Sequence, residues 1–250
     1  MRCDVLDSEF CVALGEDLDQ LTRLHDRELD GATLAALRAA GFPACLALLL
    51  TDEMATRARA NFAAALAELP DPPSARVFDE LAADYAAIYL NNRLGASPCE
   101  SVWLDDDHLV CQQPMFELRE IYAAAGLGAA DWRHRFDDHL VLQLQYLRHL
   151  LAAGAVDGVA MANFIDEHVG YWFPDFARRV AGYCQTPFYA ALAELTHAWL
   201  HGFRALLGEI YGCPVPLREE ISARINRKLA RDKAEVAPIR FMPGASGPGW

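Results

Sequence analysis

Apolar side chains recur along most of this chain at the spacing of an α-helix. In one stretch, five of them share a single helical face that we expect to be buried, namely Phe136, Leu140, Leu144, Leu147 and Leu151. Asp137 or Asp138 is the expected N-cap of this helix, because an aspartate side chain can accept hydrogen bonds from the first free backbone N–H groups. A core helix that begins beside an acidic pair and His139 is therefore predicted.

The same spacing predicts further helices on both sides of this stretch. They are expected over Ser8 to His25, from Thr33 (as cap) to Gly41, over Ala44 to Leu69 with a break near Thr51, from Ser74 to Tyr89, over Pro114 to Gly126, over Asp157 to Val169, over Asp175 to Tyr183 and over Thr186 to Gly212. Pro174 is expected to separate two of these helices, and Ser101 to Leu104 is expected to be extended. Since strand alternation, a glycine-rich phosphate loop and internal repeats are missing, the sequence predicts an all-α, single globular domain of about ten helices.

The composition changes after residue 212. We expect a helical domain over residues 1–212 and a C-terminal part over residues 213–250. The C-terminal part should contain a polar, mainly basic helix from Arg218 to Lys233, which on general grounds is a solvated surface. The Gly- and Pro-rich stretch from Pro238 to Trp250 is expected to be a disordered tail.

Composition and charge restrict the class of partner. The chain has 250 residues, of which 53% are apolar, and a formal net charge of −13. Nucleic acid is an unfavourable partner for such a chain, because binding it requires Lys and Arg to neutralise phosphates, whereas basic partners are favoured. The longest apolar run, Phe42 to Leu50, is too short to cross a bilayer, and the N-terminal residues lack a secretion signal. A cytoplasmic protein without stable membrane insertion is therefore expected, and seven scattered cysteines without a C-x-x-C pair favour reduced thiols.

The sequence offers little catalytic chemistry. His197 and His201 are four residues apart, which is a metal-binding spacing, but a third ligand is missing nearby. The acidic turn at Asp105 lacks the calcium-binding spacing of an EF-hand. Glu167 and His168 could form an acid–base pair, although no nucleophile accompanies them. We therefore expect no catalytic activity, no metal and no cofactor.

Aromatic and acidic residues near helix ends suggest a peptide groove instead. Tyr85 and Ile88 lie at the end of one predicted helix, Trp103 follows the next loop, and Asp138 and His139 open the central helix. Such residues could wall a groove for a peptide and present carboxylates to its basic residues. Helical periodicity is equally compatible with an ordinary place in the core for the three apolar side chains.

Five segments, in this order, resemble the TorD/DmsD family of molybdoenzyme-maturation chaperones. They are Tyr85 to Tyr89, Pro98 to Leu104, Asp138 to Leu140, Glu167 to Phe176 and Pro187 to Ala193. This chain departs from the family pattern at three positions, where Cys99 replaces an aromatic residue, Tyr89 replaces phenylalanine and Phe136 replaces glutamate. Asp137 can supply the carboxylate that is missing at the third of these positions.

The resemblance implies an all-helical cytoplasmic chaperone domain over residues 1–212. Members bind the twin-arginine signal peptide, the apo-form, or both, of the catalytic subunit of a molybdopterin oxidoreductase, and delay export until the cofactor is inserted. Molybdenum-cofactor biosynthesis proteins are further candidate partners, and both a monomer and a homodimer remain open. The resemblance transfers signal-peptide binding foremost to Asp138 and His139, then to an apolar side made of Tyr85, Ile88 and Trp103, with Glu100 and Ser101 as further contacts.

His139 also suggests a pH dependence, because its charge would oppose that of an arginine between about pH 5.5 and 8. Three alternatives stay open at this point. One is the nitrate-reductase branch of the same family, which assembles a membrane-bound enzyme. The others are a nucleotide-binding protein and a metal-dependent helical enzyme.

Overall fold

The computed structural model of the chain describes residues 6–49, 51–105, 107–131, 135–153 and 157–235. Within these ranges it is helical and contains no strand, so the predicted all-α fold is confirmed. The helices are α1 (Ser8–Asp26), α2 (Gly31–Ala40), α3 (Glu53–Glu68), α4 (Ala75–Tyr85), the π-helix η1 (Ala86–Leu90), α5 (Ser101–Leu104), α6 (Gln113–Ala124), α7 (Leu140–Ala152), α8 (Gly158–Glu167), α9 (Val169–Tyr183), α10 (Pro187–Tyr211) and α11 (Arg218–Glu235).

The chain divides into two compact units, Met1–Pro216 and Leu217–Trp250. The second unit contains α11, which confirms the helix predicted there. The domain boundary expected after residue 212 stays a prediction, and the expected tail from Pro238 to Trp250 lies outside the described residues. Among the helices that the structure describes, none is long and apolar enough to cross a membrane.

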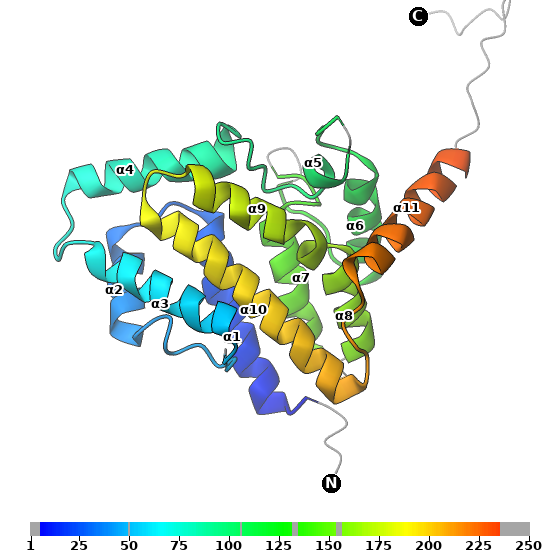
Figure 1. Cartoon of the computed structure of the whole chain (residues 1–250), viewed down its shortest axis with the longest axis horizontal. Helices are drawn as coiled ribbons and strands as arrows, with labels where there is room; N and C mark the ends of the chain where they lie inside the picture. Colours follow the sequence, from blue (N-terminus) through cyan, green and yellow to red (C-terminus); the bar gives the residue numbers. More distant parts are fainter. Residues whose placement is uncertain (1–5, 50, 106, 132–134, 154–156, 236–250) are drawn as a thin grey trace, which may run out of the picture. The chain divides into compact units, whose positions relative to one another are not determined.

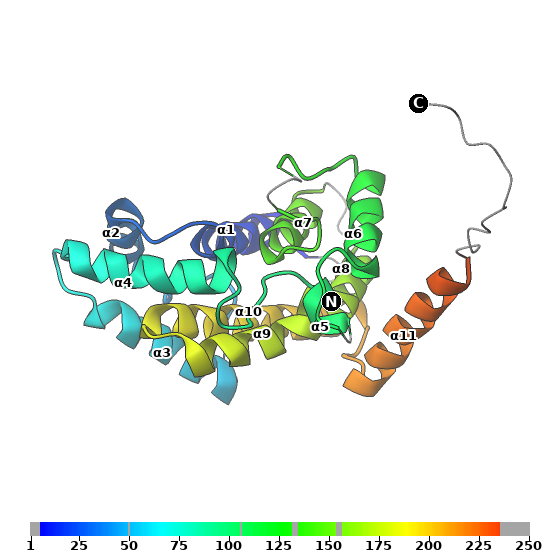
Figure 2. The same ribbon diagram turned by 90° about the horizontal axis from the view of Figure 1, so that it is seen from above.

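The first unit is built in two layers of helices (Figures 1 and 2). In one layer α10 packs against α3, α8 and α9, and in the other α1 packs against α7. The core between them is rich in aromatic side chains, since burying large apolar area is the main favourable contribution to folding. The largest fully buried ones include Trp172, Trp199, Tyr189, Phe62, Phe173 and Phe176.

The N-terminus of α10 is capped by a residue distant in sequence. Thr186 is the N-cap residue before Pro187, but its side chain makes no capping hydrogen bond. Instead, the buried carboxylate of Asp84 accepts the backbone N–H groups of Gln185 and Thr186. A carboxylate at this position also suits the positive end of the helix dipole. The cap of α2 is likewise Asp30 and not Thr33, whose N–H it accepts at 2.7 Å.

Residues 101–104 form the one-turn helix α5, so the predicted extended conformation is wrong. The valine and tryptophan in this segment favour strands, yet β-propensity depends strongly on tertiary context. Here the Ser101 N–H is bonded to the Asp138 carboxylate, and the turn closes when the Asp105 N–H donates to the Ser101 carbonyl. A distant side chain therefore decides the local conformation.

The break predicted at Pro174 is also misplaced. Helix α9 runs through Pro174 without interruption, and the chain bends at His168, whose φ of −121° and ψ of −110° are not helical. A proline inside a helix removes one hydrogen bond. In α9 this cost is offset by the complete burial of Trp172, Phe173 and Phe176 around it. The bend at His168 turns that side chain towards the site described next.

Candidate functional site

Two loops run side by side where the predicted site residues converge. The Glu100 N–H donates to the Asp138 carbonyl at 3.1 Å, and the Leu140 N–H donates to the Pro98 carbonyl at 2.8 Å. An isolated β-bridge joins Cys99 and His139 between these two bonds. Segments that are about forty residues apart in sequence are thus fixed to each other by backbone hydrogen bonds.

The side chains at the head of α7 have other partners than the sequence suggests. The Asp138 carboxylate accepts the Ser101 N–H at 2.8 Å, and Asp137 is bonded by Arg119 at 2.8 and 3.0 Å. The N-cap of α7 is His139, whose Nδ1 accepts the Val141 N–H at 3.1 Å. The predicted aspartate cap is wrong because both carboxylates are bound by segments outside the helix.

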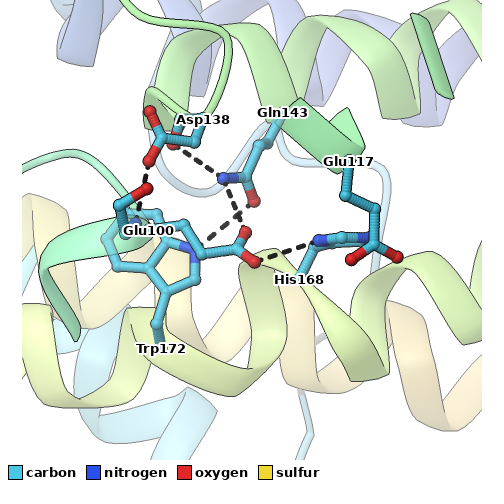
Figure 3. Close-up of polar contacts among 7 residues, drawn as sticks. Glu100, Glu117, Asp138, Gln143, His168 and Trp172 are labelled. Atoms are coloured by element: carbon cyan, nitrogen blue, oxygen red, sulfur yellow. Dashed lines mark hydrogen bonds and ion pairs between the residues drawn. The ribbon is translucent and has the colours of Figure 1, made fainter. Parts of the chain in front are cut away.

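A buried polar network lies beneath these loops, made of Glu100, Asp138, Gln143, His168 and Trp172 (Figure 3). Glu100 is its centre: Oε1 lies 3.0 Å from His168 Nδ1, and Oε2 accepts from Gln143 Nε2 at 3.0 Å. Gln143 Nε2 also donates to the Asp138 carbonyl at 2.9 Å, and Trp172 Nε1 lies 3.4 Å from Gln143 Oε1. The network therefore joins α5, α7 and α9 with the loops before α7 and at His168.

The carboxyl groups of this polar network are almost completely removed from water. Glu100 is 1% exposed and Asp138 is 0% exposed. Burial raises the pKa of the Glu100 carboxyl, and the His168 imidazole opposes this shift. Burial also raises the pKa of the Asp138 carboxyl, against the hydrogen bonds from Ser101. Asp138 Oδ1 is buried without a hydrogen-bond partner among the described residues, so this carboxyl is only half satisfied.

Tyr85 lies in a second group, the aromatic cluster, together with His25, Tyr89 and Tyr189. Ile88 is fully buried in the core. The Tyr85 and Tyr89 rings are 4.7 Å apart. His25 Nδ1 is hydrogen-bonded to the Tyr89 hydroxyl, and its Nε2 lies 2.9 Å from Thr196 Oγ1. Because complete burial disfavours the charged imidazole, it lowers the pKa of His25 to about 3. This cluster is a satisfied part of the core.

Trp103 lies between the two groups and is half-buried. Its ring stacks on Trp172 with the centroids 6.4 Å apart and the planes at 22°. It also packs edge-on against Phe176, whose ring is 6.3 Å from Tyr89. Its Nε1 donates to the Ser97 carbonyl at 2.8 Å, which fixes the indole on the loop before α5. Trp103 is the predicted site residue that is only partly buried.

The structure thus separates the predicted residues. Glu100, Ser101 and Asp138 meet at the polar network, Tyr85 lies in the aromatic cluster, Ile88 is buried in the core, and Trp103 lies between the network and the cluster. His139 is 8% exposed, and burial, assisted by the positive charge of Arg135, lowers its pKa to about 3. Its imidazole is then neutral between about pH 5.5 and 8, so the titration expected in that range does not occur in this conformation.

Sequence reasoning missed Gln143 and misassigned His168. Gln143 is a polar residue on the apolar face of α7, one turn after Leu140, and is fully buried. A polar residue at a core position is a signal of a buried network, since it needs a partner there. The sequence suggests Glu167 as the partner of His168, but His168 Nδ1 bonds Glu100, 68 residues away, and His168 Nε2 lies 3.9 Å from Glu117.

Within the described residues, His, Cys, Asp and Glu side chains form no group of three that could hold a metal ion. His197 and His201 lie one turn apart on α10, as their spacing predicts. Burial is the main cause that lowers the pKa of the His197 imidazole, and the charges of His201 and Arg178 lower it further. Its neutral form is therefore favoured.

Comparisons with known proteins place this arrangement in a wider context. The family model described as nitrate reductase delta subunit matches residues 52–178, which contain the whole polar network. A protein of Vibrio cholerae named Chaperone protein TorD is 28% identical over 200 residues, which cover 76% of this chain and 90% of that protein. A protein of the same name from Shewanella oneidensis is 33% identical, and the match covers 51% of this chain and 61% of that protein. Another from Vibrio parahaemolyticus is 26% identical, and the match covers 74% of this chain and 91% of that protein.

Proposed function

The chain belongs to the TorD-like family that the nitrate reductase delta subunit model describes, and from this premise we propose that it binds the catalytic subunit of a molybdopterin oxidoreductase. The family consists of chaperones of redox-enzyme maturation and not of enzymes. The proposed ligand is the twin-arginine signal peptide of that subunit, its apo-form, or both. Binding in the cytoplasm aids cofactor insertion and delays export until maturation is complete.

The observation that carries this proposal is the meeting of three motif segments at one place. Residues 98–104, 138–140 and 167–176 come from distant parts of the sequence and share the polar network beneath the half-buried Trp103. A twin-arginine peptide joins a basic segment to an apolar one, so its receptor needs carboxylates beside exposed apolar surface. The net charge of −13 favours such a basic ligand.

The burial of the proposed site residues suggests different roles for them. Trp103 is exposed enough to contact a peptide directly. Glu100, Ser101 and Asp138 act as positioning residues that fix the loop carrying Trp103, while Tyr85 and Ile88 support it from the core. His139 contributes a neutral imidazole at the start of α7.

Calorimetric titration tests this proposal. Synthetic twin-arginine signal peptides from the molybdoenzymes of the same genome are titrated into the wild type, Trp103→Ala and Asp138→Asn. Trp103→Ala is expected to weaken binding of one peptide by about tenfold, as expected for an aromatic residue at the centre of an interface. Tyr183→Ala, which removes an exposed aromatic ring at the end of α9, is the matched control and should bind as the wild type does. Binding to no peptide and to no apo-subunit would contradict the proposal.

The description of the family model favours one second candidate, an assembly chaperone of the nitrate-reductase type. Such a chaperone serves a membrane-bound enzyme. The two candidates differ in the client, so affinity purification of the full chain from cells that produce both classes of enzyme separates them. A co-purified exported subunit supports the first proposal, and a co-purified nitrate-reductase subunit supports the second. The same preparation gives the oligomeric state and tests molybdenum-cofactor biosynthesis proteins as additional partners.

A further inference from the structure

Asp26, a partly exposed carboxylate near the proposed site, forms ion pairs with two arginines. Asp26 is the last residue of α1, and its side chain is 21% exposed. Arg135 Nη1 lies 2.6 Å from Asp26 Oδ1, and Arg27 Nη2 lies 3.0 Å from Oδ2. Both carboxylate oxygens are therefore engaged, each by a different guanidinium. We call these three residues the Asp26 cluster.

The Asp26 cluster lies beside the residues that the family resemblance identifies. Asp26 follows His25, which is bonded to Tyr89 in the aromatic cluster, and Arg135 precedes Asp138 by three residues. The charges of Asp26 and Arg135 act on both the Tyr85 hydroxyl and the His139 imidazole. Burial is the main cause of the pKa shifts of both groups, and it raises the pKa of Tyr85 to about 12. The cluster is thus at the edge of the proposed peptide site.

Three carboxylates of the polar network and of the head of α7 are less accessible to a ligand than Asp26. Glu100 and Asp138 are buried in the polar network. The side chain of Asp137 is 4% exposed and is bonded by two nitrogens of Arg119. Asp26 combines access to solvent with burial deep enough to limit screening of its charge, since screening is weaker for partly buried pairs. Among these four carboxylates, it is the most accessible to an incoming arginine.

We propose that Asp26 receives an arginine of the twin-arginine signal peptide, and that Arg135 occupies this place in the ligand-free protein. This inference rests on the proposed function. The incoming guanidinium takes over Oδ1 from Arg135, while Arg27 keeps Oδ2. Since one carboxylate–guanidinium pair replaces another, the exchange leaves no buried charge unpaired.

The site also distinguishes arginine from lysine. A ligand must bind Asp26 Oδ1 in place of Arg135, and the guanidinium of arginine is more weakly hydrated than the ammonium of lysine, so it loses less on entering a partly buried ion pair. Arg135 lowers the affinity of every basic ligand by the same factor, because each of them must displace it, so only the ligands that bind Asp26 tightly keep a measurable affinity. We therefore expect arginine to be strongly preferred to lysine at this position.

Calorimetric titration with a twin-arginine signal peptide and its twin-lysine analogue tests the inference. Asp26→Asn is expected to weaken binding of the arginine peptide by about tenfold, the loss of one charge-assisted contact. Arg135→Gln is expected to tighten binding of both peptides by about threefold and to leave the ratio of their affinities unchanged. Arg148→Gln is the matched control, because Arg148 forms an ion pair of the same kind from α7 to Asp19 on α1, at 3.0 Å. It removes the same charge and should bind as the wild type does.

The outcomes separate this inference from the proposed function. If Trp103→Ala weakens binding but Asp26→Asn does not, the inference is overturned and the proposed function stands. If the wild type binds no twin-arginine peptide, the inference is overturned, and the proposed function is overturned as well if the wild type also binds no apo-subunit. Thermal unfolding verifies that each variant is folded. Should Asp26→Asn not fold, the result for Arg135→Gln decides, because an affinity that is unchanged or weaker would exclude a competing arginine.

Discussion

The polar network and the Asp26 cluster both bring charged side chains together from distant segments, but they differ in their access to water. Glu100 and Asp138 are 1% and 0% exposed, whereas the side chains of Asp26 and Arg135 are 21% and 31% exposed. A buried polar group needs its partner, because leaving it unsatisfied costs its full desolvation. A partly exposed ion pair can exchange its partner for water or for another charge. The first arrangement fixes loops, and the second can take part in recognition.

Glu100→Ala should break the polar network with the largest effect. It leaves His168 Nδ1 and Gln143 Nε2 without the acceptor they share, so we expect a loss of about 3–5 kcal/mol in the free energy of unfolding. Urea unfolding monitored by circular dichroism measures it. Glu100→Gln, which keeps the shape and one acceptor oxygen, should lose clearly less. Equal losses for the two variants would mean that the hydrogen bonds of Glu100 contribute little.

The buried histidines should make the protein less stable in mild acid. The pKa values of His25 and His139 are about 3 in the folded protein, below the ordinary value of about 6.5. Their contribution to stability is therefore complete above pH 6.5 and is lost as the pH falls from 6.5 towards 3. Each histidine should cost about 2 kcal/mol between pH 6.5 and 5, at about 1.4 kcal/mol per pH unit.

Unfolding of the wild type and His139→Asn at pH 6.5 and pH 5 checks this sign and size. Asparagine can keep the capping bond to the Val141 N–H, so the variant should fold while its stability falls less steeply with acid. An unchanged pH dependence would show that His139 is accessible to protons in the folded protein.

The carboxyls of Glu100 and Asp138 have raised pKa values in the folded protein, so their contribution to stability has the opposite pH dependence from that of the histidines. It is present at low pH and is lost as the pH rises.

Arg119→Gln should have an intermediate effect and so sharpen the contrast. Its guanidinium is half-exposed, but the Asp137 carboxylate that it binds is buried, which leaves that charge with a weaker donor in the variant. We expect a loss of about 1.5 kcal/mol, within the range of hydrogen bonds to charged groups. Thermal unfolding against the wild type and Arg148→Gln measures the difference. If Arg119→Gln loses no more stability than Arg148→Gln does, the ion pair of Arg119 and Asp137 is as exchangeable as the partly exposed pairs are.

The Asp26 cluster should have the smallest effect on stability. Arg135→Gln is expected to change the free energy of unfolding by less than about 1 kcal/mol, because exposed ion pairs contribute little. The same variant is expected to bind a twin-arginine peptide more tightly. Urea unfolding of Arg135→Gln beside Glu100→Ala compares the two regions directly. A loss as large as that of Glu100→Ala would make the cluster a structural element and not an exchangeable one.

Most of the fold follows from local patterns. The apolar face of α7 and the glycine that ends α10 were readable in the sequence, because helical periodicity and left-handed glycine caps depend on nearby residues. The errors occur where a distant residue decides. Asp138 folds residues 101–104 into a turn, and the buried aromatic side chains of α9 carry Pro174 inside a helix. The expected aspartate caps at α7 failed for the same reason.

The site shows the same division more sharply. The sequence by itself determined the helical fold, the family resemblance and the residue types of the proposed site, since these depend on spacing and composition. Only the tertiary structure decided which charges are buried, because burial and pairing depend on partners far away in sequence. Glu100 bonds to His168, 68 residues later, and Asp26, at the end of α1, bonds to Arg135 on the loop before α7. A carboxylate that positions a loop and one that can receive an arginine look alike in the sequence, and only their distant partners and their access to water distinguish them.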